Sequence, residues 1–135
     1  MKKYLNPVLK VMLSLLLVSP ILGTLGLFPA PTREMYTSDQ AFTFINALMT
    51  SGYIMVIMAI CFFVAIILLW TKRTAAAALL ILPFTVNIVG FHLMLDGGLF
   101  TAGAIMGNVL LILNAYFLWQ HRATYKQLIA AETKK

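Results

Sequence analysis

Four long apolar stretches separated by short polar segments dominate the hydropathy pattern of this chain. They cover residues 8–28, 52–70, 75–95 and 99–119. A helix needs roughly 20 apolar residues to cross the hydrocarbon of a bilayer, and each stretch is close to that length. The pattern therefore predicts an all-α, polytopic membrane protein: an antiparallel bundle of four transmembrane helices. The four crossings occupy most of the chain, so we expect one integral membrane domain (residues 1–135).

Positive charge is concentrated in alternate gaps between these stretches. Of the ten Lys and Arg residues, all but Arg33 lie before or at the start of the first stretch, separate the second from the third, or follow the fourth. Because cytoplasmic loops are enriched in Lys and Arg, we expect both termini and the turn at Lys72 and Arg73 to be cytoplasmic. The loops that contain Arg33 and Asp96 then face outward. This architecture suits the cytoplasmic (inner) membrane of a bacterium.

The first outer loop contains a second helical pattern. Ser38 is a typical helix cap, Asp39 places an acid in the first turn, and apolar residues follow at helical spacing from Phe42. We predict a short helix over about residues 39–50 that lies on the outer membrane surface or packs into the mouth of the bundle.

Proline and glycine positions refine the four predicted crossings. Pro20 and Pro83 lie near the middle of the first and third stretches, where we expect kinks. Gly103 and Gly107 form a Gly-x-x-x-Gly pair, which suits close helix packing in a membrane. The polar tail from Gln120 is expected to continue as a helix into the cytoplasm.

The composition agrees with a membrane protein and limits the classes of partner that we expect. The chain is 61% hydrophobic and 10% charged, whereas soluble domains are about 25% charged. The net charge of +6 flanks the apolar stretches, so we expect contact with anionic lipid of the bilayer and no binding of nucleic acid. The single cysteine, Cys61, cannot form an internal disulfide or a C-x-x-C redox pair.

Polar side chains within apolar stretches are functional candidates, because burying them in hydrocarbon is costly. His92 and Asp96 are four residues apart, so they share one face at the outer end of the third stretch. The carboxylate could orient the imidazole and make a proton-handling pair. The alternative is that both side chains lie in the wet interface, where Asp96 caps a turn.

Two asparagines extend this group to a candidate ligand site between the third and fourth stretches. Asn87, His92 and Asn108 would line the pocket, with Phe91 and Phe84 as aromatic walls. Such a pocket suits the head group of a quinone or another small amphipathic molecule. In the alternative interpretation, the asparagines form hydrogen bonds between helices and have a structural role.

The sequence predicts no catalytic residue and no haem or metal site. His92 lies near the outside and His121 at the inner boundary, so the two cannot ligate one haem. There is no cluster of His, Cys, Asp and Glu for a non-haem metal, and no phosphate loop, nucleophile elbow or zinc motif. On its own the chain is poorly equipped as an enzyme.

An ordered set of features extends from about residue 31 to residue 128. It comprises a proline-rich start of the outer loop, a short basic turn, a Leu-Pro pair, an Asn-to-His run and an aromatic end of the fourth stretch. In sequence order these are Pro29 and Pro31, Ala41-Phe42, Gly52-Tyr53, Lys72-Arg73, Leu82-Pro83, Asn87 to His92, and Tyr116 to Trp119 with Arg122 and Tyr125. Because it carries these features in this order, the chain resembles the DoxX-like family of small four-helix membrane proteins.

The resemblance implies association with redox enzymes. Members of that family are similar to a subunit of a thiosulfate:quinone oxidoreductase or terminal oxidase, and others are linked to oxidative-stress complexes. Members often carry Gly and Lys at the end of the first helix and Glu within the second. Here residues 25–28 read Leu-Gly-Leu-Phe and residues 59–62 read Ala-Ile-Cys-Phe, so chemistry that needs an intramembrane carboxylate is not implied.

Three functions stay open from the sequence. The first is a non-catalytic subunit or anchor of a quinone-linked membrane redox assembly, with a redox enzyme as partner. The second is a small transporter or exporter that acts as a homo-oligomer, although no stretch contains the acid that couples protons to transport in small multidrug exporters. The third is a structural protein that interacts with lipid.

Overall fold

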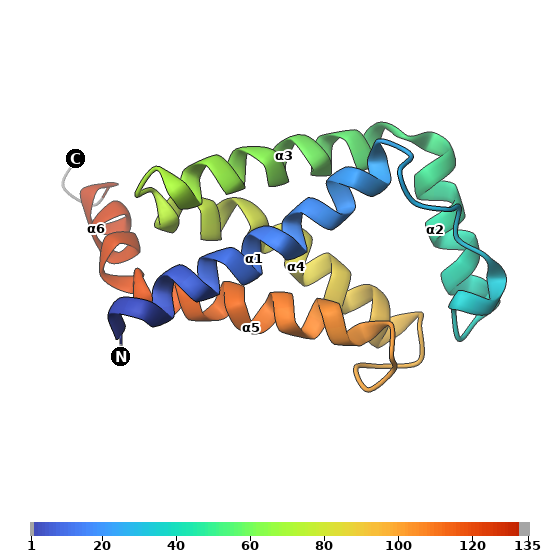
Figure 1. Ribbon diagram of the computed structural model, residues 1–135. Coiled ribbons are helices and arrows are strands. Elements are labelled where there is room, and N and C mark those ends of the chain that lie inside the picture. Colours follow the sequence, from blue (N-terminus) through green and yellow to red (C-terminus); the bar gives the residue numbers. More distant parts are fainter. Residues whose placement is uncertain (1, 133–135) are drawn as a thin grey trace.

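The computed structural model describes residues 2–132, and this part of the chain is helical without strands. The long helices are α1 (Lys2–Thr24), α3 (Tyr53–Trp70), α4 (Thr74–Met94) and α5 (Ala104–Gln120). The shorter elements are the 3₁₀ turn η1 (Arg33–Met35) and the helices α2 (Asp39–Ser51) and α6 (Arg122–Glu132). Figure 1 shows the long helices running between two ends of the molecule, which we call the α2 end and the α6 end after the short helix at each.

Three of the long helices are sufficiently long and apolar to cross a membrane, judged by length and composition. They are Tyr4–Thr24 within α1, and the whole of α3 and α4. Helix α5 is a shorter apolar helix of 17 residues. These helices indicate a helical membrane protein. The predicted boundaries of the second and third stretches are confirmed to within one residue at each end.

The first and fourth stretches differ from their predicted boundaries because local backbone geometry overrides apolar content. Helix α1 begins at Lys2 and ends at Thr24, four residues before the predicted end, where Gly26 adopts a positive φ of 77° and its N–H bonds the carbonyl of Gly23. Helix α5 begins at Ala104, because the chain forms turns and bends from Leu95 to Gly103, with positive φ at Gly97 and Gly98.

The short helix in the first loop is confirmed as α2. The Ser38 hydroxyl accepts a hydrogen bond from the N–H of Ala41 at 3.0 Å, which is the predicted N-terminal cap. Gly52, with φ of 71°, ends α2 and begins α3, so the chain reverses there within one residue.

Pro20 and Pro83 lie inside continuous helices, and in each case a side chain one turn later bonds the proline carbonyl. Thr24 Oγ1 donates to Pro20 O, and Asn87 Nδ2 donates to Pro83 O, both at 2.9 Å. The tail does not continue α5: the helix breaks at His121, α6 follows, and residues 133–135 lie outside the described part.

The long helices share an apolar core. Helix α1 packs against α3 and α5, α3 packs against α4, and α4 packs against α5. The buried apolar residues come from all four: Leu13, Leu17, Phe62, Ala65, Leu69, Ala77, Ala78, Ile81, Leu110, Leu113 and Phe117. Gly107 lets α5 approach α4 closely, because a Cβ at this position would lie 3.0 Å from Ile88 Cγ2.

Candidate ligand-binding site

A cavity of about 700 Å³ lies at the α2 end, between α4, α3, α2 and η1. This volume is within the range of about 300–1,000 Å³ that is usual for ligand pockets. Its lining residues are Met35, Tyr36, Phe44, Ile45, Leu48, Ile54, Met55, Met58, Phe84, Asn87, Ile88, Phe91, His92, Asp96 and Gly103. Four of the five candidate residues therefore meet at one cavity, and Asn108 is outside it.

The cavity lies on a different side of α4 from the one that the sequence predicted. We expected a pocket between the third and fourth stretches, but α5 packs closely against α4 there. A Cβ on Gly107 would lie 3.6 Å from His92 Cδ2, and one on Gly103 would lie 3.4 Å from His92 Cε1. The close approach at Gly107 leaves no space in that seam, Gly103 lines the edge of the cavity, and most of the open space faces α3 and α2.

His92 and Asp96 form the polar pair that the spacing predicted. His92 Nδ1 lies 2.9 Å from Asp96 Oδ2, and Asp96 is 2% exposed. The other oxygen, Oδ1, accepts the backbone N–H of Thr37 at 2.9 Å and its hydroxyl at 3.1 Å. One residue later, the Ser38 hydroxyl donates to the carbonyl of Leu95 at 2.6 Å. The carboxylate therefore orients the imidazole and also fastens the loop before α2 to the end of α4.

These contacts decide the charge state of the carboxyl group. Burial alone raises the pKa of Asp96, but the hydrogen bonds from Thr37 and His92, together with the charge of a protonated His92, outweigh burial. The pKa of Asp96 therefore lies below its ordinary value of 3.8. The ionised carboxylate accepts hydrogen bonds and cannot donate them, so His92 Nδ1 carries the proton. In the neutral ring, Nε2 then has the free lone pair.

Aromatic side chains form one wall of the cavity around Phe91. The Phe44 ring stacks on Phe91 with centroids 5.8 Å apart, and Tyr36 meets Phe91 edge-on at 6.3 Å. Burial raises the pKa of Tyr36, and the negative charge of Asp96 raises it further, so its hydroxyl is neutral. Phe91 lines the cavity, and its aromatic partners come from the segment that covers it.

The asparagines have separate environments. Asn87 lines the cavity, and its bond to Pro83 O leaves one amide N–H and the amide oxygen for other contacts. Asn108 Nδ2 donates to Leu99 O at 2.7 Å and holds the turn before α5. Asn114 is fully buried and donates to Ala78 O at 3.3 Å, so it joins α5 to α4.

Sequence reasoning did not identify Thr37, Tyr36, Met55 or Met58 as site residues. The helical spacing of apolar residues in α2 indicated that one face of this helix packs on the rest of the protein, and Ser38 marked its start. No local pattern pairs Thr37 with Asp96, which is 59 residues away.

Within residues 2–132, no group of three or more His, Cys, Asp or Glu side chains is placed to hold a metal. No family model matches the chain, and no curated protein and no solved structure matches it. The resemblance to the DoxX-like family therefore stays an expectation from the sequence.

Proposed function

We propose that this chain is a four-crossing integral membrane protein that binds the head group of a quinone, or of a similar amphipathic molecule, in the cavity at the α2 end. In this proposal it is a non-catalytic subunit or anchor of a membrane redox assembly. One observation carries the proposal: the buried carboxyl group of Asp96 bonds His92 in the wall of a largely apolar cavity.

The four-crossing topology is supported by the placement of α5. At 1.5 Å per residue, its 17 residues span about 26 Å, slightly less than the ~30 Å hydrocarbon core. Modest thinning of the bilayer accommodates a mismatch of that size. A fourth crossing also returns α6 to the side where α1 begins, which agrees with Figure 1.

The charge distribution supports an orientation with the α6 end in the cytoplasm. Lys10, Lys72, Arg73, Arg122 and Lys126 lie toward that end. In contrast, the only Lys or Arg among the described residues at the α2 end is Arg33, which pairs with Asp39. We place the protein in a bacterial cytoplasmic membrane with both termini inside.

The donor set of the cavity suits a quinone head group. A quinone presents carbonyl oxygens when oxidised and hydroxyls when reduced, and it carries electrons and protons between redox enzymes. The free amide N–H of Asn87 can donate to a carbonyl, and the Nε2 lone pair of His92 can accept from a hydroxyl. Phe84, Phe91 and Met58 supply apolar surface for the ring. In this proposal the residues bind and orient the molecule and perform no chemical step.

The DoxX-like resemblance supports a redox partner for this site. Helices α1, α3, α4 and α5 contain no Asp or Glu, so the transporter alternative has no intramembrane carboxylate to couple protons in these helices. We therefore favour a binding subunit over an exporter.

A binding experiment tests the ligand. The purified protein in neutral detergent is titrated with a short-chain ubiquinone, and binding is followed by calorimetry. His92→Gln and Asn87→Leu should each weaken binding by about tenfold, because each removes one polar contact to the head group. His121→Gln, at the α6 end, is the matched control and should bind as the wild type does. Equal affinity in all four proteins, or no binding in any, rejects the ligand proposal.

A separate experiment tests the partner. The protein is purified from native membranes in mild detergent, and the retained proteins are identified by mass spectrometry. An oxidoreductase at equal stoichiometry supports the subunit role. Recovery of this chain alone contradicts that role and leaves the binding result unaffected.

A further inference from the structure

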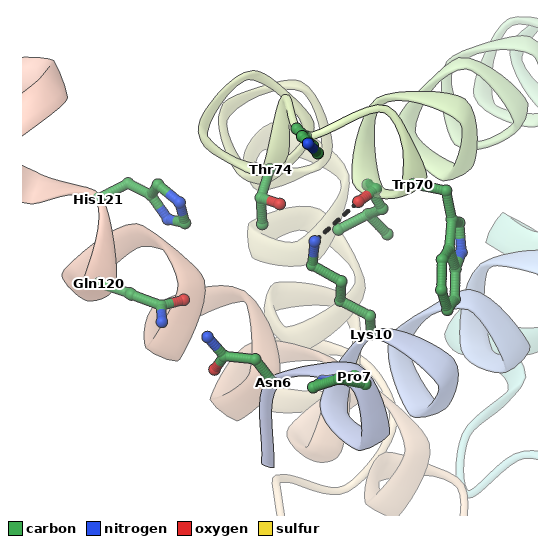
Figure 2. A pocket seen from close by; sticks show the side chains of 9 residues that line it. Asn6, Pro7, Lys10, Trp70, Thr74, Gln120 and His121 are labelled. Carbon is green, nitrogen blue, oxygen red and sulfur yellow. Dashed lines mark hydrogen bonds between the residues drawn. The ribbon is translucent and has the colours of Figure 1, made fainter. Parts of the chain in front are cut away.

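A second cavity, of about 500 Å³, opens at the α6 end (Figure 2). Its walls come from three places: the first turns of α1, the turn between α3 and α4, and the end of α5. Lys10 and Lys72 contribute two positive charges, and Asn6 and Gln120 contribute amides. This cavity lies at the opposite end of the long helices from the one that contains His92.

Lys10 reaches into this cavity from α1. Its ammonium donates to the carbonyl of Leu69 at 2.9 Å, drawn as the dashed line in Figure 2. That carbonyl is in the last turn of α3 and has no helical partner of its own, so the contact holds the charged group in place. An ammonium carries three N–H donors, and this bond uses one of them.

Asn6 is also oriented for donation. Its amide oxygen accepts the Tyr116 hydroxyl at 2.8 Å, which leaves the amide N–H groups as the free part of the side chain. In Figure 2, the side chains of Asn6, Gln120 and His121 extend toward the same space as that of Lys10. The cavity therefore offers several donors beside the charge of Lys10, which is held in place, and that of the exposed Lys72.

These charges have no acidic partner among the residues that the structure describes. The two ion pairs found there join Arg33 to Asp39 and His92 to Asp96, and both lie at the α2 end. Leaving the partly buried Lys10 without an anionic partner is unfavourable unless an anion or water neutralises it, and the exposed Lys72 adds a second positive charge beside it. The neighbouring Trp70 donates its indole N–H to Ser14 at 3.1 Å, and tryptophan in a membrane protein is enriched at the depth of lipid head groups.

We propose that this cavity binds a phosphate group, carried by an anionic phospholipid of the leaflet on the α6 side. Basic pockets between transmembrane helices are the usual sites for such head groups. Lys10 and Lys72 would neutralise the phosphate, and the amide of Asn6 would donate to its oxygens. Free phosphate has the same chemistry, and the experiment below separates the two sources. The proposal is independent of the ligand in the α2-end cavity.

The test uses the full chain in neutral detergent with three probes: dihexanoyl phosphatidylglycerol, dihexanoyl phosphatidylcholine and inorganic phosphate. Binding is measured by calorimetry and by the shift in thermal unfolding temperature. Lys10→Gln and Lys72→Gln should each weaken phosphatidylglycerol binding by about fivefold, the size expected for one lysine beside an anionic lipid. Lys10→Gln also removes the hydrogen bond to Leu69 and could fail to fold. Lys72→Gln keeps that bond, so weaker binding by this variant is not caused by such a folding defect.

Arg73→Gln is the matched control, because it removes the same charge from the same turn at a residue that does not line the cavity. It should change the affinity by less than about twofold, as expected for an exposed charge. Binding of phosphatidylglycerol without binding of inorganic phosphate assigns the site to lipid, and tight binding of inorganic phosphate assigns it to the free anion. Equal binding of phosphatidylcholine, no binding of any probe, or equal losses in Arg73→Gln and Lys72→Gln overturn the proposal.

Discussion

Thr37 and Asp96 are 59 residues apart in the chain, yet Thr37 donates both its backbone N–H and its hydroxyl to one oxygen of the Asp96 carboxylate. The other oxygen of that carboxylate bonds His92. One buried side chain thus positions the candidate ligand-binding group and fixes the segment that covers the cavity. A change at Asp96 should therefore affect both features together.

Replacing Asp96 by Asn should lower the free energy of unfolding by about 1–3 kcal/mol. The Asn amide oxygen can still accept from Thr37, but its NH₂ group cannot accept from His92 Nδ1–H. Thr37→Val removes one hydroxyl donor and should cost about 0.5–1.5 kcal/mol. Denaturant titration of both variants and of the double variant measures the coupling between the residues. Strictly additive losses would show that the two residues do not stabilise each other.

Stability should fall when the solution becomes strongly acidic. The pKa of Asp96 in the folded protein lies below its ordinary value of 3.8, so the carboxylate stabilises the fold fully above about pH 3.8. That contribution is lost as the pH falls through the lower, folded-state pKa. Thermal unfolding at several pH values should show that the difference between the wild type and Asp96→Asn shrinks below pH 3.8. A difference that stayed constant at low pH would contradict this origin.

Gly107 should tolerate no larger side chain. Because its Cβ would already lie 3.0 Å from Ile88 Cγ2, Gly107→Val should separate α5 from α4 and cost about 1–3 kcal/mol. Gly90→Val is the control, since nothing lies within 4 Å of a Cβ there. Unfolding in detergent measures both. Combining Gly107→Val with Ile88→Leu, which removes the clashing methyl, should recover part of the loss.

Variants of Asn114 test how much a buried polar side chain contributes to the stability of the fold. Its side chain is fully buried, and its Oδ1 has no hydrogen-bond partner among the described residues. Its two donor contacts, to Ala78 O and Thr85 Oγ1, are long at 3.3 and 3.4 Å. Asn114→Leu should therefore change stability by less than about 1 kcal/mol, because interhelical bonds in membranes average ~0.6 kcal/mol. Asn114→Ala should cost more, because it leaves a void. The reverse order of these two variants would identify the polar contacts as the main contribution.

The parts of the fold that follow from local patterns were predictable. The apolar runs gave α3 and α4 to within one residue, and Ser38 gave the start of α2. The C-terminal end of α1 and the start of α5 were not, because they depend on backbone turns at Gly26 and Gly97 that hydropathy does not describe.

The candidate site was predictable only where its residues share one helix. Phe91, His92 and Asp96 come together through helical spacing, and all three line the α2-end cavity. Asn108 was grouped with them because it lies in the next stretch, but its position depends on how α5 packs against α4. Predicting the cavity itself would have required knowing that α2 lies against α3 and α4, and these contacts join segments that are distant in the sequence.

The segment that covers the α2-end cavity, Thr37 with α2, is synthesised before the residue that fixes it. Thr37 and α2 leave the ribosome before α4 exists, so the acceptor that fixes them is made 59 residues later. Until Asp96 is made, the segment can form its own helix and contact α3, but it lacks the hydrogen bonds that fix it to the end of α4. Closure of the cavity is therefore a late event in biogenesis. A chain arrested before Asp96 would contain the covering segment without the hydrogen bonds from Thr37 to Asp96 that hold it in place.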